Sequence, residues 1–234
     1  MILDSRNIRD FVEFIKKNVK GIDVFNFIRE LITSEYFIPA LDLFIELGGK
    51  VNIVDADGRT PIFILTSFDA THVIANPIDM LGPGVGALQS IVTNNIYQGI
   101  EILIKNGVDI NHVAKDGSNA AHHIYFPLRD IVVKLLVKSN IDLTKVNANH
   151  KMPIVSILIN ADYATIVNII KYSGDQMNEP PYLPYVKSAD TFIALMKSKN
   201  IKRIHELLNC GDKMQPIYQS LYKRFGLTEF KIFH

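Results

Sequence analysis

The sequence predicts an all-α fold, a solenoid of about five to six helix-turn-helix units with short β-turn fingers and helical caps at both ends. The first observation is internal repetition: residues 101–124 repeat the pattern of residues 42–65, and residues 134–158 form a third copy. In the first two copies an apolar helix end precedes a glycine, a Val-Asn or Ile-Asn pair, an Asp-Gly pair and another apolar run. The second observation is that apolar residues recur at the three- and four-residue spacing of a helix face.

The spacing of the copies indicates a period. His150 stands in the third copy where Gly117 stands in the second, 33 residues earlier. The same step back from Gly117 reaches Gly84, which predicts a turn finger in the segment GPGVG at 82–86. Gly58 precedes Gly84 by only 26 residues, so the outer part of that unit is expected to be abbreviated or irregular.

The elements follow as a single domain over residues 1–234. An N-terminal helix near 7–18 and a helix pair near 24–33 and 36–47 are expected within a capping section, 1–53. The repeats fill 54–213, as units at 54–80, 81–113, 114–146, 147–185 and 186–213. A C-terminal cap, 214–234, contains a last helix near 216–225, because a terminal repeat must present a polar outer face.

Two units need separate alignment. In the unit at 81–113, one set of apolar residues marks an inner helix and a second set an outer helix: Leu88, Ile91 and Val92, then Ile100, Leu103 and Ile104. In the last unit, Ala189 falls in the turn position, 39 residues after His150. The excess falls in a proline-rich loop, SGDQMNEPPYLPYV.

The turns have a specific chemistry. Thr60 is expected to cap a helix with its hydroxyl, and Pro61 at the first helical position loses no hydrogen bond. The glycine of each Asp-Gly pair suits a tight turn with positive φ. For His150 two alternatives stand: Asn149 takes some of the strained geometry, or the turn opens.

Three short segments support a family resemblance. Thr60-Pro61-Ile62-Phe63, Asn119-Ala120-Ala121-His122 and Met152-Pro153-Ile154-Val155 each keep part of a Thr-Pro-Leu-His signature. With the period, they make the chain resemble ankyrin-repeat proteins. The resemblance implies a β-turn and two antiparallel helices per unit, with His122 bonded to backbone near the turn. Degenerate repeats of this kind resemble those of intracellular bacteria and large DNA viruses, which implies action on host proteins inside a host cell.

Composition excludes several classes of function. The net charge is +1, although residues 186–234 carry nine basic and four acidic residues. The single cysteine, Cys210, excludes an internal disulfide and a cysteine-based zinc site, which favours a reducing, cytoplasmic location. The uncharged run at 80–100 is interrupted by glycine, proline and amide residues, so no membrane span is expected. We expect a monomer.

No catalytic set emerges from the residues. His122 and His123 diverge by about 100° on a helix, and no nearby acid completes a metal-ligand set. His205 and Cys210 lie on different sides of a helix, with the cysteine at the end whose dipole opposes a thiolate. GPGVG has neither of the phosphate-binding glycine spacings. We therefore predict no enzyme, no cofactor and no metal.

The predicted function is binding of a partner protein or peptide by the concave surface of fingertips and inner helices. The candidate contacts are Asp57, Arg59, Phe68, Asn94, Lys115, Asp116, Ser118, Phe126, Asn149 and Lys151.

Two other functions stay open. One is a small-ligand or enzymatic pocket formed by segments 68–86 and 173–186, with four candidate lining residues: His72, Asp79, Asp175 and Tyr182. The other is binding of nucleic acid or anionic lipid by the basic C-terminal section. In that section Ile217, Leu221 and Phe225 are expected to dock the last helix, leaving Lys223 and Arg224 in water.

Overall fold

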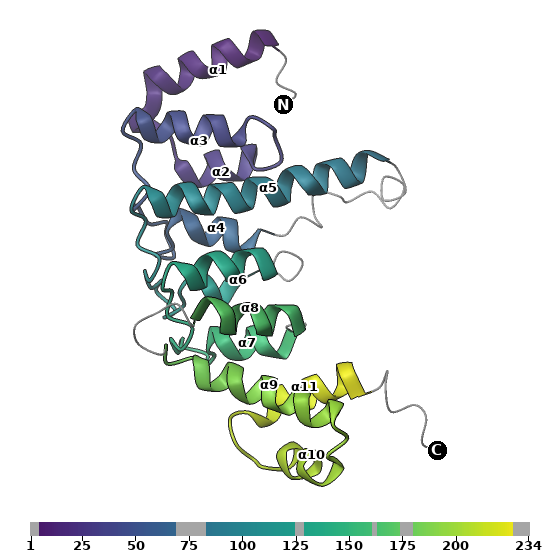
Figure 1. The fold of residues 1–234 in the computed structure, drawn as a ribbon. Coiled ribbons are helices and arrows are strands. Elements are labelled where there is room, and N and C mark those ends of the chain that lie inside the picture. The colour runs from purple at the N-terminus through teal and green to yellow at the C-terminus, as the bar shows by residue number, and fades with distance from the viewer. Residues whose placement is uncertain (1–4, 69–82, 125–128, 161–162, 174–179, 227–234) are drawn as a thin grey trace. The chain divides into compact units, whose positions relative to one another are not determined.

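The computed structural model describes residues 5–68, 83–124, 129–160, 163–173 and 180–226 of the 234-residue chain (Figure 1). Every regular element in these ranges is helical: there are eleven α-helices, with short 3-10 and π segments and no strand. The all-α prediction is confirmed. The chain divides into two compact units, residues 1–128 and residues 129–234. Within the described ranges, no helix combines the length and apolar character needed to cross a membrane.

In the described part of the first unit there are five α-helices and two 3-10 helices. They are α1 (Ser5–Asn18), η1 (Val19–Gly21), α2 (Val24–Leu31), α3 (Phe37–Glu46), α4 (Pro61–Ser67), α5 (Pro83–Lys105) and η4 (Ala120–His123). Helix α2 contacts α3 and α4, and α5 contacts α3 and α4 in turn. Their shared core includes the fully buried side chains of Phe37, Leu41, Phe44, Ile62 and Leu65. The predicted helices near 7–18, 24–33 and 36–47 correspond to α1, α2 and α3.

Helix α5 overturns the prediction of a turn at Gly84 and of separate inner and outer helices in the unit at 81–113. The 23 residues from Pro83 to Lys105 form one helix. Its buried apolar positions, Val92, Ile96, Ile100 and Leu103, continue as one stripe through the point where a break was expected. Packing of this stripe on α3 and α4 outweighs the weak helix propensity of Gly99, which lies within it.

Two residues in the middle of α5 explain how closely this helix packs against its neighbours. A Cβ atom on Gly99 would lie 2.9 Å from the Phe37 ring and 3.0 Å from Leu65, so glycine permits the helix to approach both. The Asn95 side chain is buried and donates to the carbonyl oxygens of Ile32 at 2.8 Å and Ser34 at 2.7 Å. Asn95 thereby adds a donor to the Ile32 carbonyl just past the end of α2 and a second donor to the Ser34 carbonyl, which also accepts the Phe37 N–H at 3.2 Å.

Three loops share one backbone geometry. Each loop contains two residues with positive φ, ten positions apart, and the pairs are Gly48 and Gly58, Gly107 and Gly117, and Asn140 and His150. We call residues 48–60 finger 1, residues 107–119 finger 2 and residues 140–152 finger 3. Fingers 1 and 2 lie in the first unit and finger 3 in the second.

The first residue of each pair ends a helix. The next backbone N–H donates to the carbonyl five residues earlier: Gly49 to Phe44 at 2.9 Å, Val108 to Leu103 at 3.0 Å, and Ile141 to Leu136 at 3.1 Å. This six-to-one bond after a left-handed residue is the Schellman pattern of helix termination.

The second residue of each pair closes a tight turn. Its N–H donates over 2.9 Å to a carbonyl three residues earlier, and these donors and acceptors are Gly58 to Asp55, Gly117 to Ala114, and His150 to Asn147. The glycine prediction is confirmed by φ values of +77° at Gly58 and +78° at Gly117. Both alternatives for His150 are wrong, because His150 itself takes φ +56° and the turn stays closed.

Helix α4 begins as predicted, but for a different reason. Thr60 occupies the N-cap position with extended backbone angles, and Pro61 is the first helical residue. The Thr60 hydroxyl makes no capping bond; its oxygen is buried without a hydrogen-bond partner. The start of α4 therefore depends on Pro61 and on burial of Ile62 and Leu65, both 0% exposed.

The second unit, over its described residues, contains six α-helices and a π segment. They are α6 (Arg129–Lys138), α7 (Pro153–Asn160), α8 (Tyr163–Ser173), α9 (Leu183–Lys197), α10 (Ile201–Leu208), α11 (Gln215–Leu221) and η6 (Tyr222–Gly226). Helix α8 contacts α6 and α9, while α11 contacts α7, α9 and α10. Ala189 does not lie in a turn as predicted: it is buried within α9, because the helix continues through Lys197.

The end of the second unit corrects one prediction about the cap. Ile217 and Leu221 are fully buried, as expected, and Lys223 is exposed. Arg224 does not face water: its Nη2 donates to the carbonyl oxygens of Leu158 at 3.3 Å and Ile159 at 2.6 Å. The guanidinium instead satisfies carbonyl groups near the end of α7, which ties η6 to that helix. The side chain of Phe225 lies outside the described residues.

Candidate functional site

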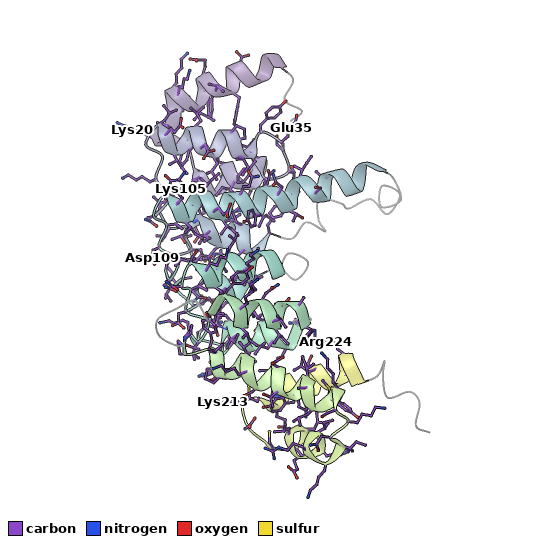
Figure 2. All side chains as sticks on the ribbon, in the orientation of Figure 1. Lys20, Glu35, Lys105, Asp109, Lys213 and Arg224 are labelled. Carbon is purple, nitrogen blue, oxygen red and sulfur yellow. The ribbon has the colours of Figure 1, made fainter. Side chains whose placement is uncertain are left out.

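Fingers 1 and 2 are joined by side chains near their bases. Asn52 Nδ2 donates to the Gly107 carbonyl at 2.6 Å, and Asn52 Oδ1 accepts the Asp109 N–H at 2.8 Å. His112 Nε2 lies 2.7 Å from the Gly58 carbonyl oxygen. Figure 2 shows Asp109 at the edge of the first unit where α5 ends, with Glu35 on the opposite side. The two fingers therefore form one continuous surface at that edge.

The tips of the two fingers are joined by Lys115. Its backbone N–H donates to the Asp57 carbonyl at 3.0 Å, and its Nζ donates to the Ala56 carbonyl at 2.7 Å. Lys115 and Asp57 were both predicted as partner contacts, and both are exposed. The structure brings them together, with the Asp57 carboxylate 67% exposed beside a lysine whose head group is already bonded to finger 1.

Arg59 is held by the acidic residues of its own finger. Its Nε lies 3.2 Å from Asp55 Oδ2, and its Nη2 pairs with the Asp57 carboxylate. Burial raises the pKa of Asp55, but the backbone N–H groups of Arg59 and Asp57 and the Arg59 charge outweigh burial and leave that pKa below its ordinary value. Arg59 is thus a half-exposed, paired cation whose orientation is fixed before any partner arrives.

In finger 2, Asp116 and Ser118 occupy the positions that Asp57 and Arg59 occupy in finger 1. The Ser118 N–H and hydroxyl both donate to the Asp116 carboxylate, each over 2.9 Å. The bond from the Ser118 N–H is the main reason that the pKa of Asp116 lies below its ordinary value. Asp116 is exposed, but Ser118 is fully buried and has no surface to offer a partner.

Finger 3 replaces the acid of finger 1 with an amide. Asn147 occupies the position of Asp55, and its Oδ1 accepts the backbone N–H of Asn149 and of Lys151, each at 3.0 Å. Asn149 and Lys151, both predicted contacts, are exposed at the tip of this finger. The same turn is therefore stabilised by a charged acceptor in finger 1 and a neutral one in finger 3.

The remaining predicted contacts lie away from the fingertips or cannot be placed. Asn94 is exposed on α5 and accepts a bond from Gln98 Nε2 at 2.9 Å. Phe68 is half-buried at the C-terminal cap of α4. Phe126 lies outside the described residues.

Each finger carries an exposed valine that the sequence reasoning missed. Val54, Val113 and Val146 are 52%, 38% and 52% exposed, and each precedes the closing residue of its finger by four positions. An isolated exposed valine needs no explanation, but equivalent exposure in three fingers is a property of the repeated unit. The detectable signal was the common register with Gly58, Gly117 and His150.

His122 and His123 both make contacts that stabilise the fold. His122 Nδ1 accepts the Asn119 N–H at 3.1 Å, within a reciprocal capping arrangement, so the expected bond to backbone is present. The His123 ring packs 5.7 Å from the Phe63 ring, and burial lowers its pKa. Among the described residues, no three histidine, cysteine or acidic side chains lie together as a metal site.

The pocket proposed from segments 68–86 and 173–186 cannot be assembled from the described residues. His72, Asp79 and Asp175 lie outside them, while Tyr182 is buried at 3% exposure in the second unit. A hollow of about 350 Å³ does occur in the first unit, between α1 and α2. Its lining includes Phe11, Phe14 and Phe27, none of which belongs to the predicted pocket.

Comparison with known proteins adds no relative. A scan against protein-family models finds no match to the chain, and a search of curated proteins finds no similar sequence. Function must therefore be inferred from the residues and their geometry.

Proposed function

We propose that the chain is an ankyrin-type repeat protein that binds a partner protein through its fingers and has no catalytic role. The observation that carries the proposal is the exposure of Val54, Val113 and Val146 at one position of a repeated turn. The repeated helix ends and closing turns support the ankyrin-type interpretation, which the family resemblance first suggested. Repeat proteins of this kind commonly use such an edge for recognition.

The chemistry of the finger surface suits a protein partner. Each valine offers an apolar contact, and each is flanked by exposed polar groups, with Asp57 in finger 1, Lys115 and Asp116 in finger 2, and Asn149 and Lys151 in finger 3. A small apolar centre with a hydrogen-bonding rim is the usual composition of a protein interface. Hydrogen bonds hold the backbone at the tips of fingers 1 and 2, so these tips lose little conformational entropy on binding.

The proposal extends to the location and the partner. Cys210 is exposed and unpaired, which suits a reducing compartment such as the cytoplasm. That the partner is a host protein rests on the family resemblance alone.

A peptide selection tests the proposal. Peptides would be selected from a random library on the whole protein, and their affinities compared between wild type and the double variant Val54→Ser, Val113→Ser. Burial of the exposed half of a valine contributes about 1 kcal/mol, so we expect the double variant to bind about tenfold or more weakly. Ile201→Ser, at a residue 57% exposed on α10, is the matched control and should change affinity less than about twofold. If the selected peptides bind the double valine variant as tightly as they bind wild type, the fingers do not form the binding site.

A further inference from the structure

Helix α8 exposes a second stripe of side chains, on a different part of the chain from the fingers. Tyr163, Val167 and Lys171 are spaced by four residues and are all exposed, the first two at 40% and 39%. Ile166 and Ile169 on the other side of the helix are buried at 0% and 1%. The exposed stripe therefore has an apolar centre, because residues at this spacing share one helix face.

Lysine side chains gather at both ends of this stripe. At its start, Lys197 of α9 lies over the Tyr163 ring, 3.9 Å from the ring centre. At its end, three ammonium groups surround the Tyr172 ring at 5.2, 4.9 and 6.0 Å from its centre, and they belong to Lys134, Lys138 and Lys171. We call these four lysines with Tyr163, Val167 and Tyr172 the α8 surface.

Three of the four lysines of the α8 surface carry uncompensated charge. Lys138, Lys171 and Lys197 form no ion pair with any described residue. Among the acidic residues of the helices that carry these lysines, Asp190 lies seven positions before Lys197 on α9 and Asp130 lies eight positions before Lys138 on α6, so two acids do not balance Lys138, Lys171 and Lys197. A hydrogen bond from Lys134, with the charges of the neighbouring lysines, holds the pKa of the Tyr172 hydroxyl below its ordinary value. Like charges gathered around one ring favour an incoming anion.

We propose that the α8 surface binds an acidic segment of a partner protein. Carboxylates of the segment pair with the lysines at the two ends, and an apolar side chain between them covers Val167 and the edge of Tyr163. The complementarity of charge and the apolar centre select this occupant. This surface is separate from the fingers and does not depend on the function proposed for them.

A nucleic acid fits the same charges less well. Binding of single-stranded nucleic acid uses aromatic rings as platforms on which bases stack. Here ammonium groups already lie over the rings of Tyr163 and Tyr172. The apolar Val167 between them offers nothing to a phosphate backbone.

The length of the stripe defines the segment. Tyr163 and Lys171 are eight residues apart on one face of α8, or about 12 Å at the helical rise. An extended peptide covers about 12 Å in about four residues. A segment with acidic pairs on either side of a short apolar run therefore reaches both groups of lysines.

The test uses the whole protein and a fluorescent peptide, Glu-Glu-Leu-Val-Leu-Glu-Glu, with the glutamates replaced by glutamine as the comparison peptide. Fluorescence anisotropy should show at least about tenfold tighter binding of the acidic peptide. The triple variant Lys138→Gln, Lys171→Gln, Lys197→Gln should weaken that binding about tenfold, since each exposed ion pair contributes a factor of a few. Val167→Ser should weaken the binding of the acidic peptide and of its glutamine counterpart by a similar factor.

A matched control separates a specific surface from general attraction. Lys145, Lys202 and Lys213 are exposed lysines of the same unit outside the α8 surface. Their triple substitution by glutamine changes the net charge equally and should alter the Kd less than about twofold. Far-ultraviolet circular dichroism checks that every variant is folded.

Three results would overturn the proposal: equal weakening by both triple variants, no preference for the acidic peptide over its glutamine counterpart, or tighter binding of single-stranded DNA than of the acidic peptide. The double valine variant of the fingers should leave peptide binding to α8 unchanged. The proposal for the fingers and the proposal for the α8 surface can therefore be refuted independently of each other.

Discussion

Asp55 determines how firmly finger 1 is held. Its Oδ1 accepts the backbone N–H of Asp57 and of Arg59, each at 2.9 Å, and its Oδ2 accepts Arg59 Nε at 3.2 Å. Asp55→Ala removes the acceptor of both backbone donors. Since each hydrogen bond contributes about 0.5–1.5 kcal/mol, the free energy of unfolding should fall by about 1–3 kcal/mol. Asp55→Asn keeps an oxygen in place, as Asn147 does in finger 3, and should lose less than about 1 kcal/mol.

Urea unfolding followed by circular dichroism measures the free energies of both variants. Amide hydrogen exchange at Asp57 and Arg59 reports on finger 1 itself, and Asp55→Ala should accelerate exchange there more than Asp55→Asn. The reasoning is refuted if the two substitutions destabilise the protein equally, within about 0.3 kcal/mol. Equality would mean that the carboxylate charge, and not the acceptor geometry, stabilises the turn.

The same residue gives a pH dependence with a defined sign. The pKa of Asp55 lies below its ordinary value of 3.8 in the folded protein. Its ionised form therefore stabilises the fold above that value, and this contribution is lost as the pH falls through the folded pKa. Asp55→Asn has no such group. The difference in stability between wild type and Asp55→Asn, measured at neutral pH, should shrink when the urea titrations are repeated below about pH 4.

Two further predictions concern the turns and the C-terminal cap. Gly117→Ala places a side chain at φ +78° and should lower the free energy of unfolding by about 1–2 kcal/mol. His150→Gly relieves a similar strain at φ +56° and should leave that free energy unchanged or raise it by up to about 1 kcal/mol. Urea unfolding measures both. Arg224→Ala should destabilise the protein by about 1–3 kcal/mol in thermal unfolding, because the Leu158 and Ile159 carbonyls lose the guanidinium, while Ile159 keeps the Ser220 hydroxyl as a donor at 2.6 Å. Substitution of exposed Lys223 by alanine should stay within about 0.5 kcal/mol. Equal effects of the two C-terminal substitutions would contradict the role of Arg224.

Local turn chemistry was readable from the sequence where it depends on one residue type. The positive φ of Gly58 and Gly117 followed from Asp-Gly pairs, and the start of α4 followed from Pro61. His150 was harder, because a histidine in a left-handed conformation has no signal of its own. The bonds to Asn147 keep that turn closed, and they become visible only when the three fingers are compared.

Predictions that depend on tertiary packing failed. The 33-residue step back to Gly84 falls within α5. A glycine near a helix start reads as a turn until the contacts of α5 with α3 and α4 are known. Arg224 looked like a solvated cation because its acceptors, Leu158 and Ile159, lie far away in sequence.

The candidate surface was predicted only in part. Asp57, Lys115, Asp116, Asn149 and Lys151 are exposed at the fingertips, as expected. The three exposed valines were not predicted because valine in a sequence usually indicates a core position. Its exposure depends on the course of the folded finger, which the local sequence does not specify.

The methyl groups of the exposed finger valines test the central claim most directly. With valine methyl labelling, NMR spectra of the whole protein can be recorded as a peptide selected from the random library is added. The account predicts that the largest shift changes and the intermolecular contacts occur at Val54 and Val113, in the two joined fingers of the first unit, with buried Val24 unchanged. Changes confined to other methyl groups, with these two unaffected at saturation, would contradict binding through the fingers.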